Sequence, residues 1–392
     1  MSTQDDSPTS RRWLIVVPTA IVVLLGAGWS GFWYWSSAMA EATMTTWRTR
    51  EAEAGRVYGC ANTSFGGYPF RIEVTCTEPS VDDRANAQSI RARNITAVAQ
   101  VWDPTQVIGE ITGPLTVAPL GGAPTATIDW AVAQGSLRGT PGAPERLSIV
   151  LDEPSLAAAP ASAPLAKAEH MEFHGRFAAE STPGHPVLDL ALDLKSVTAP
   201  ALAAAFGTFA PLATASTDLS LVSVLRGAPD LAPKPLAQRL REIQAANGRL
   251  DITNARLQQG DLVATANGAL GLTARGTLTG ELRLTVVNFA KLIPMLGIDR
   301  AVAQFVTPDT VNRFAPALDK LMPGLGNVLR GNTGGNAPGG GNASANTALA
   351  GAALGGKQAE LDGQPAVTLV LRFDDGVAFL GPLKLGQVPP LY

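Results

Sequence analysis

The alternation of apolar and polar residues is clearest between residues 249 and 287, which read RLDITNARLQQGDLVATANGALGLTARGTLTGELRLTVV. Four stretches of this segment place apolar residues at every second position. Turn residues separate the stretches at Gln259-Gly260, Asn267-Gly268 and either Arg275-Gly276 or Thr279-Gly280. A period of two is typical of half-buried antiparallel strands, so the segment predicts a meander of four strands.

Shorter alternating segments predict further strands on both sides of the meander. They are Ser89–Trp102, Gln106–Val117, Thr125–Ala133, Arg146–Leu151, Lys167–Phe177 and Pro186–Leu194 before it, and Ala366–Asp374 with Val377–Leu385 after it. Three segments have a helical period instead: Pro200–Leu212, Lys234–Ala246 and Asn288–Leu329. Gly331–Gly356 contains almost no bulky or charged residues, which predicts a flexible loop.

An almost uninterrupted apolar run, WLIVVPTAIVVLLGAGWSGFWYW, extends from Trp13 to Trp35 without a charged residue. It is long enough to cross a hydrocarbon core as a helix, and its terminal aromatic residues suit the two membrane interfaces. Ala38-Met39-Ala40 supports a competing interpretation as a cleaved signal peptide, but the run is longer than a signal h-region. Arg11 and Arg12 before the run favour a cytoplasmic N-terminus, which places most of the chain outside the cytoplasm.

These segments predict an α+β fold that is rich in β-structure. Residues 1–12 form a cytoplasmic N-terminus, 13–35 a transmembrane anchor and 36–56 a membrane-proximal helix that continues it. Residues 57–230 form an N-terminal β-rich half, and residues 231–392 a C-terminal half with a helix, the meander, further helices, the flexible loop and a final hairpin. The expected architecture is an N-terminal transmembrane helix followed by a large curved antiparallel sheet packed with several helices.

Both cysteines, Cys60 and Cys76, lie in the segment YGCANTSFGGYPFRIEVTC. If two strands pair around Tyr68, the cysteines lie directly opposite each other, at a separation that a disulfide spans. Asn62 and Ser64 would then oppose apolar residues, so a bulge near the glycines is an alternative register. Buried thiols and a redox pair are alternatives to a disulfide. A location outside the cytoplasm favours the disulfide.

Composition excludes some classes of function. The 392 residues carry a net charge of −3, and only 16% are charged, so there is no basic excess to neutralise nucleic-acid phosphates. A G-x-G-x-x-G match at Gly26–Gly31 lies inside the apolar run and follows no strand, which argues against a dinucleotide site. The chain has no G-x-S-x-G motif. We therefore expect a protein without catalytic residues or a cofactor.

His170, Glu172 and His174 share one face if their segment is a strand, and the two histidines lie one turn apart if it is a helix. A metal or proton-transfer site is one interpretation of this cluster. The other is the solvent-facing side of a strand whose opposite face carries Met171 and Phe173. The spacing is not the His-Glu-x-x-His pattern, and no second cluster of ligands is nearby, so we expect no metal site.

Several of these residues together resemble a known pattern. Its elements are a short membrane anchor, Trp47 in the next helix, a hairpin from Cys60 to Cys76 with Gly67, Tyr68, Pro69, Phe70 and Arg71, and an ending with Asp375, Gly376, Gly381, Gly386, Pro390 and Leu391. This combination resembles the alphaproteobacterial family catalogued as domain of unknown function 2125, over nearly the whole chain. The resemblance implies structural turns rather than catalytic signatures.

The meander is more distantly similar to AsmA-like and TamB-like envelope proteins, which are associated with lipid movement along curved sheets with an apolar inner face. These resemblances imply a single-pass protein of the inner membrane with its bulk in the periplasm. In the first hypothesis, lipid contacts or moves along an apolar sheet face; against it, such a face also packs on helices as an ordinary core. The second is an envelope scaffold that binds a protein partner. The third, a metal-dependent enzyme using His170 and His174, is disfavoured.

Overall fold

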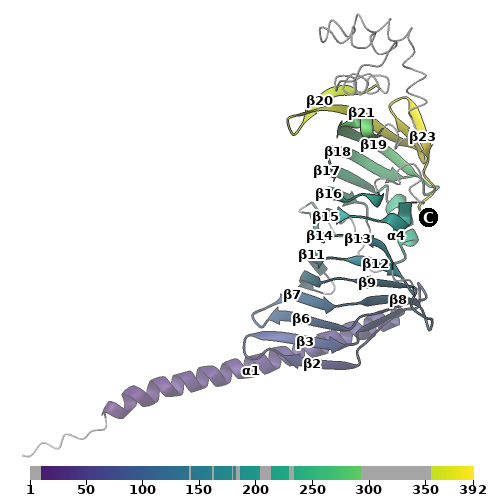
Figure 1. Ribbon diagram of the computed structural model, residues 1–392. Coiled ribbons are helices and arrows are strands. Elements are labelled where there is room, and N and C mark those ends of the chain that lie inside the picture. The colour runs from purple at the N-terminus through teal and green to yellow at the C-terminus, as the bar shows by residue number, and fades with distance from the viewer. Residues whose placement is uncertain are drawn as a thin grey trace, which may run out of the picture. The chain divides into compact units, whose positions relative to one another are not determined.

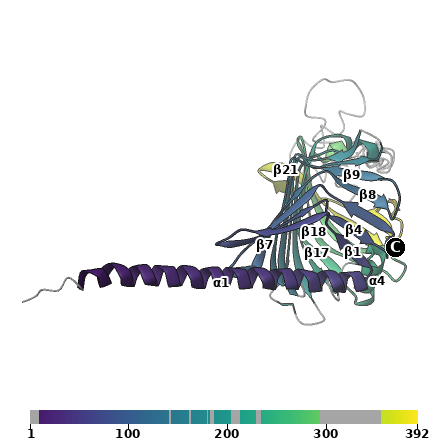
Figure 2. The ribbon, with the colours of Figure 1, turned by 90° about the horizontal axis from the view of Figure 1, so that it is seen from below.

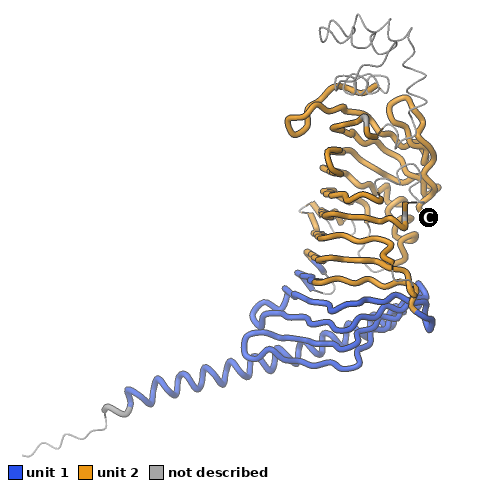
Figure 3. The backbone as a smooth tube through the Cα atoms, viewed as in Figure 1, with its two compact units in different colours: residues 1–123, 134–144 blue, residues 124–133, 145–392 orange. Residues whose placement is uncertain are grey.

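The computed structural model describes residues 10–140, 143–160, 163–178, 180–181, 186–203, 213–228, 234–292 and 355–392. The chain divides into two compact units (Figure 3). Unit 1 consists of residues 1–123 and 134–144, and unit 2 of residues 124–133 and 145–392. The predicted boundary near residue 230 falls inside unit 2. The predicted helices beyond residue 292 and the predicted loop up to residue 354 lie outside the described residues.

Unit 1 begins with α1, Ser10–Glu53, a single continuous helix of 44 residues. Its first half is the apolar run, and its second half consists mostly of good helix formers. The helix ends before Gly55, whose φ of +86° lies in the left-handed region that glycine adopts without strain. Figures 1 and 2 show the C-terminal part of α1 beside the first strand, β1 (Arg56–Gly59), whereas its N-terminal part extends beyond the strands of the unit.

The strands of unit 1 form two antiparallel sheets. The first contains, in spatial order, β1, β4 (Ser80–Asp83), β5 (Gln88–Arg91) and β8 (Leu115–Pro119). The second contains β2 (Asn62–Gly66), β3 (Arg71–Thr77), β6 (Asn94–Gln100), β7 (Asp103–Thr112) and β10 (Val132–Thr140). Strands that follow each other in sequence, such as β3 and β4, belong to different sheets. The chain therefore passes repeatedly from one sheet to the other.

Such passages make three of the predicted strands wrong. Ser89–Trp102 is divided into β5 and β6, Gln106–Val117 is divided into β7 and β8 at Gly113-Pro114, and Thr125–Ala133 is divided into a strand over Ala126–Asp129 and the beginning of β10. Apolar residues keep a period of two through the second passage, so alternation does not reveal it. The proline does, because it has no N–H group with which to continue a ladder. Glu78-Pro79 marks another passage, between β3 and β4, and Glu78 has a φ of +49° there.

Unit 2 also contains two antiparallel sheets. The smaller consists of β9 (Ala126–Asp129), β12 (Ser155–Ala158) and β13 (Pro164–Lys167). The larger contains, in spatial order, β11 (Ala143–Asp152), β14 (His170–Phe177), β15 (Val187–Val197), β16 (Thr217–Arg226), β17 (Arg249–Gln259), β18 (Leu262–Leu272), β19 (Leu278–Val287), β21 (Gln364–Asp374), β22 (Val377–Leu380) and β23 (Leu383–Gln387), with β20 (Lys357–Leu361) also beside β21. The predicted large antiparallel sheet is confirmed, and within the described residues it does not close on itself.

Helices in the described part of unit 2 are few. The predicted helix over Lys234–Ala246 is α4, Leu236–Ala245, which ends at Asn247-Gly248. Two short 3₁₀ helices, η1 (Pro200–Leu202) and η3 (Phe289–Lys291), begin the other two segments for which helices were predicted. The remainder of those two segments is largely outside the described residues.

The meander between residues 249 and 287 contains three strands rather than the four predicted. Its turns follow Gln259 and Leu272, whereas Gly268 and Gly280 lie within β18 and β19. Both have positive φ angles, +146° and +130°, and a Cβ atom at Gly268 would collide with the carbonyl oxygen of Glu281 on the neighbouring strand. Glycine is required here because two backbones approach closely. The dipeptide Asn267-Gly268 is also typical of a hairpin turn, so the sequence alone does not show which of the two roles the glycine has.

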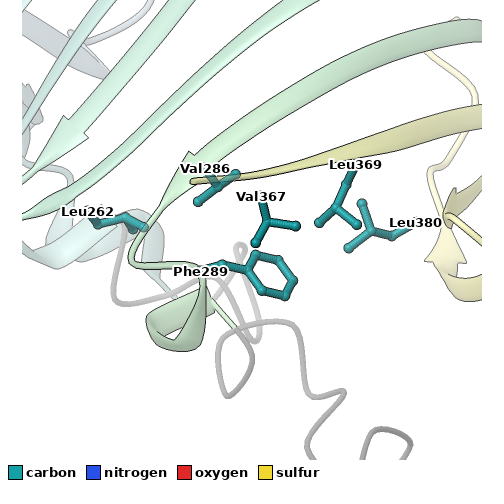
Figure 4. Packing of buried hydrophobic residues seen from close by; sticks show 6 residues of the cluster. All are labelled: Leu262, Val286, Phe289, Val367, Leu369 and Leu380. Carbon is teal, nitrogen blue, oxygen red and sulfur yellow. The ribbon is translucent and has the colours of Figure 1, made fainter. Parts of the chain in front are cut away.

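The most completely buried cluster of unit 2 lies near the β23 end of the larger sheet. Phe289 follows β19 and packs against strands β18, β19, β21 and β22 (Figure 4). The other members of the cluster are Leu262, Val286, Val367, Leu369 and Leu380. Phe289 is only 1% exposed, and full burial of a side chain of this size contributes roughly 1.5–3 kcal/mol. At another place, Ile243 of α4 packs on Leu188 and Ala228.

Candidate functional site

The larger sheet of unit 2 carries two uninterrupted rows of apolar side chains across eight strands, from β11 to β21. Residues that lie directly opposite each other in an antiparallel pair point to the same face, so the strand register identifies the members of each row. One row is Ile149, Phe173, Leu192, Leu221, Ala255, Ala266, Leu284 and Leu369; the next is Leu151, Met171, Leu194, Leu219, Leu257, Ala264, Val286 and Val367. We call these sixteen residues the apolar face.

The opposite side of the same strands is polar. The row between the two apolar rows, on the other face, is Val150, Glu172, Asp193, Ser220, Arg256, Thr265, Thr285 and Thr368. Seven of its eight members are polar or charged, whereas the apolar face has none. Residues alternate between apolar and polar along each strand, and the strand register aligns those of the same kind. The sheet therefore has one apolar and one polar face over these rows.

The apolar face is covered unevenly by the described residues. Near β21, Phe289 and Leu380 cover it, and Val286 and Leu369 are each 1% exposed. From β14 to β17, by contrast, its large side chains are only half-buried; they are Phe173, Met171, Leu192, Leu194, Leu219, Leu221 and Leu257. The seven strand spacings from β11 to β21, at ~4.8 Å each, make the face about 34 Å long.

In unit 1, a disulfide links the segment before β2 to β3. Cys60 and Cys76 form a disulfide with a Cα–Cα separation of 5.6 Å, which confirms the predicted bond. The predicted register is wrong, because Cys76 lies opposite Thr63, and Cys60 lies between β1 and β2. Phe65 thereby lies opposite Val74. This register avoids the polar residues that the predicted pairing would have placed against the apolar side of β3.

The turn between β2 and β3 contacts α1 through hydrogen bonds and ring contacts, including a hydrogen bond of 2.9 Å between the hydroxyls of Tyr68 and Ser30. The indole N–H of Trp29 donates to the carbonyl oxygen of Pro69 at 2.9 Å, and that of Trp33 donates to Arg71 at 2.8 Å. The rings of Trp33 and Tyr68 lie edge to face at 5.4 Å, and Phe70 lies 6.1 Å from Trp29. We call Trp29, Trp33 and the turn residues Gly67, Tyr68, Pro69, Phe70 and Arg71 the helix clamp.

The helix clamp combines this directed bonding with burial. Trp33 is 7% exposed and packs against Ile72 of β3 and Val101, which are also buried. Gly67 has a φ of +95°, and a Cβ atom there would come within 2.6 Å of the carbonyl oxygen of Arg71. Glycine is therefore required for the close turn. The five residues from Gly67 to Arg71 thus have a structural role, as expected for turn residues.

The sequence did not reveal the helix side of the clamp. Trp29 and Trp33 were interpreted only as part of an aromatic belt at a membrane interface, and such belts need no protein partner. Their spacing of four residues, which places both on one side of a helix, was the available signal. Further along α1, Trp47 contacts Tyr58 with ring centroids 4.5 Å apart and ring planes tilted by 47°, and Arg48 donates to the sulfur of Cys60 at 3.2 Å.

His170, Glu172 and His174 share the polar face of β14, as predicted for a strand. Glu172 accepts from Nε2 of His170 at 2.8 Å and lies 3.2 Å from Nε2 of His174. Asp152 is 2.6 Å from Nδ1 of His170. Hydrogen bonds to Glu172 and then Asp152 raise the pKa of His170, and those from the histidines lower the pKa of Glu172. Among the described residues, no group of three or more His, Cys, Asp or Glu is arranged to hold a metal ion.

The final residues of the predicted motif also stabilise turns. Asp375 and Gly376 take positive φ angles between β21 and β22, and Oδ1 of Asp375 accepts a hydrogen bond of 2.6 Å from Thr277. The N–H of Leu391 donates to the carbonyl oxygen of Gly276. These contacts attach the C-terminal residues to the turn between β18 and β19.

Residues 33–389 match a family described as "Uncharacterized protein conserved in bacteria (DUF2125)". The match includes Trp33, the hairpin, the apolar face and the final motif as far as Gly386. No match was found among curated proteins.

Proposed function

The chain belongs to the bacterial family DUF2125, and we propose a function for it from the geometry of its two units. The helix α1 anchors the protein in the inner membrane, the strands lie in the periplasm, and acyl chains of lipids bind along the apolar face of unit 2. In this proposal the apolar face conveys lipid, and no reaction is catalysed.

Two observations support the anchor and the compartment. The apolar run of α1 is exposed from Trp13 to Gly28, with Trp13, Leu14, Leu24 and Leu25 each about 70% exposed, and among the described residues α1 is the one helix long and apolar enough to cross a membrane. The disulfide between Cys60 and Cys76 favours an oxidising compartment, because cytoplasmic thiols are kept reduced. If α1 crosses the inner membrane once, its exposed apolar run lies in lipid and the disulfide lies in the oxidising compartment.

The observation that carries the lipid proposal is the half-buried part of the apolar face. An apolar surface that the described residues leave only partly covered is typical of a site for an apolar ligand. The partly covered strands, β14 to β17, span three strand spacings or about 14 Å, close to half of the ~30 Å hydrocarbon thickness of a bilayer, so an acyl chain from one leaflet has room along them. Each CH₂ group buried against it contributes about 0.8 kcal/mol. The distant resemblance to AsmA-like and TamB-like proteins suggests the same role and stays a prediction.

Lipid bound to the purified protein tests this proposal. The full-length protein is extracted in mild detergent, and its bound lipid is quantified by native mass spectrometry. A double variant, Leu192→Glu with Leu221→Glu, places two charges on the apolar face. A matched control, Ala191→Glu with Ser220→Glu, places the same charges on neighbouring residues of the polar face.

We expect stoichiometric lipid on the wild type and the control, and its loss from the apolar-face variant. Absence of lipid from the wild type, or equal lipid on both variants, contradicts the proposal. Proximity labelling in cells separates the alternative: one dominant protein neighbour, with no bound lipid, favours an envelope scaffold.

A further inference from the structure

Three aromatic side chains at or beside the helix clamp remain more than half exposed, although two of them also contact α1. Tyr68 is 56% exposed, Phe70 60% and Trp102 57%. They belong to two adjacent turns, because the N–H of Val101, beside Trp102, donates to the carbonyl oxygen of Phe70 at 3.2 Å. Their neighbours Ile72 and Val101 are buried against Trp33, so the turns are held in place while more than half of each aromatic side chain stays exposed beside α1.

The helix clamp fixes the position of these turns along α1. Trp29 and Trp33 contact Pro69 and Arg71, and they lie 16 and 20 residues after Trp13. At 1.5 Å per residue these separations correspond to about 24 and 30 Å along the helix axis. The hydrocarbon core of a bilayer is about 30 Å thick. If α1 crosses the bilayer from Trp13, the turns lie at the level of the distal interface.

Several backbone groups of the β2–β3 turn are already paired by hydrogen bonds. The carbonyl oxygen of Pro69 accepts from Trp29, that of Phe70 from Val101, and that of Arg71 from Trp33. The N–H of Arg71 donates to Gly67. An unsatisfied backbone group costs several kcal/mol in a lipid environment, so these bonds remove the main obstacle to placing a turn there. The residue types also fit, because Tyr and Trp concentrate at membrane interfaces.

We propose that Tyr68, Phe70 and Trp102 insert into the interfacial layer of the phospholipid bilayer beside α1. The inference rests on the proposed anchoring role of α1 and adds a second point of attachment to the membrane. Unit 1 then sits directly on the bilayer surface, with the hairpin as a wedge next to the helix. The ligand surface is a lipid interface, not a protein.

Fluorescence quenching in lipid nanodiscs tests this placement on the full-length protein. A cysteine is introduced at Phe70 (Phe70→Cys) or, separately, at Trp102 (Trp102→Cys), and is labelled with an environment-sensitive dye while Cys60 and Cys76 remain paired. Trp102→Cys provides an independent readout, because this residue is not part of the helix clamp. Two reference variants are Leu25→Cys in the apolar run of α1 and Asn62→Cys at the opposite end of β2.

We expect lipids with nitroxide near the ester groups to quench the dye at residues 70 and 102, with a blue-shifted emission and reduced access to aqueous iodide. The dye at residue 62 should stay unquenched by lipid, and the dye at residue 25 should be quenched by nitroxide deep in the acyl chains. Quenching at residue 25 but not at 70 or 102 overturns the inference and leaves the anchor intact. No quenching at residue 25 overturns the anchor and the inference together. Protection of residues 70 and 102 from iodide without lipid quenching indicates a protein partner instead and also overturns it.

Discussion

Both units have an apolar strand face, but the two faces are covered differently. In unit 1, α1 covers the side of β3 that carries Ile72 and Val74, and Trp33 fills the contact. In unit 2, the described residues leave the apolar face half-buried from β14 to β17. The contact in unit 1 depends on a few directed hydrogen bonds and one large ring. The apolar face of unit 2 consists mostly of similar aliphatic side chains that are repeated from strand to strand. Single side chains should therefore matter in unit 1, and the face as a whole should matter in unit 2.

Trp33→Ala should produce the largest change in stability. The substitution removes a buried ring and leaves the carbonyl oxygen of Arg71 without its donor, so we expect the free energy of unfolding of unit 1 to fall by about 3–5 kcal/mol. Trp35→Ala, at a residue 61% exposed, is the matched control and should change stability little. Hydrogen exchange of β3 and β6 in detergent measures the effect. Equal effects of the two substitutions would show that Trp33 does not hold the hairpin.

Removal of the disulfide should have the next largest effect. In the double variant Cys60→Ser with Cys76→Ser, the unfolded chain regains the entropy of a loop closed over 16 positions, which corresponds to about 3 kcal/mol. Denaturant unfolding with segment-resolved hydrogen exchange should show the loss in unit 1 and not in unit 2. Thiol titration of the unreduced, unfolded wild type is the direct control. Two free thiols would contradict both the bond and the compartment inferred from it.

In unit 2, outside the buried cluster around Phe289, the sensitive positions should be glycines rather than individual apolar side chains. Gly268→Ala forces a Cβ atom against the backbone of β19 at a φ of +146°, so we expect a loss of about 2 kcal/mol. Gly260→Ala, at a φ of +59° with open space around it, should cost about 1 kcal/mol or less. Thermal unfolding of both variants gives the difference. A larger loss at Gly260 would contradict the close approach of β18 and β19.

The sequence predicted the apolar face better than the helix clamp. Alternation along residues 249–287 and its neighbours defined which side chains share a face, since period-2 alternation depends only on local geometry. It did not show where the chain passes between sheets, or that Gly268 and Gly280 lie inside strands, because turn dipeptides and close backbone contacts use the same residue.

The helix clamp depends on contacts between residues about 40 positions apart, such as Trp29 and Pro69. Neither residue type identifies its partner in the sequence. The observed register of β2 on β3 pairs Phe65 with Val74, whereas the predicted one placed the two cysteines opposite each other. The disulfide itself was predicted correctly from an incorrect register. The chain has no third cysteine, so the predicted pairing did not depend on the strand alignment.

The smallest effect should come from the polar side of β14. The raised pKa of His170 means that its ion pair with Glu172 and Asp152 is fully present below its ordinary pKa of about 6.5 and is lost as pH rises through the folded-state pKa. The lowered pKa of Glu172 keeps this carboxylate charged in acid down to below about pH 4.3. His170→Gln should therefore destabilise the protein more at about pH 6 than at about pH 9, by less than about 1 kcal/mol for these partly exposed groups.

NMR titration of the histidine ring checks the same point directly. Asn or Gln at position 174 is a suitable control, because His174 is bonded only to Glu172 and Ser148 in this cluster. A His170 pKa below about 6.5 would contradict the ion pair.

Photo-crosslinking from adjacent residues of one strand tests most directly whether the apolar face binds lipid. A photoreactive amino acid replaces Leu221 on the apolar face or Ser220 on the polar face of β16 in cells, and the products are identified by mass spectrometry. We predict lipid adducts at residue 221 and none at residue 220. Adducts at residue 221 formed only with protein, or equal lipid adducts at the two residues, would contradict the proposal.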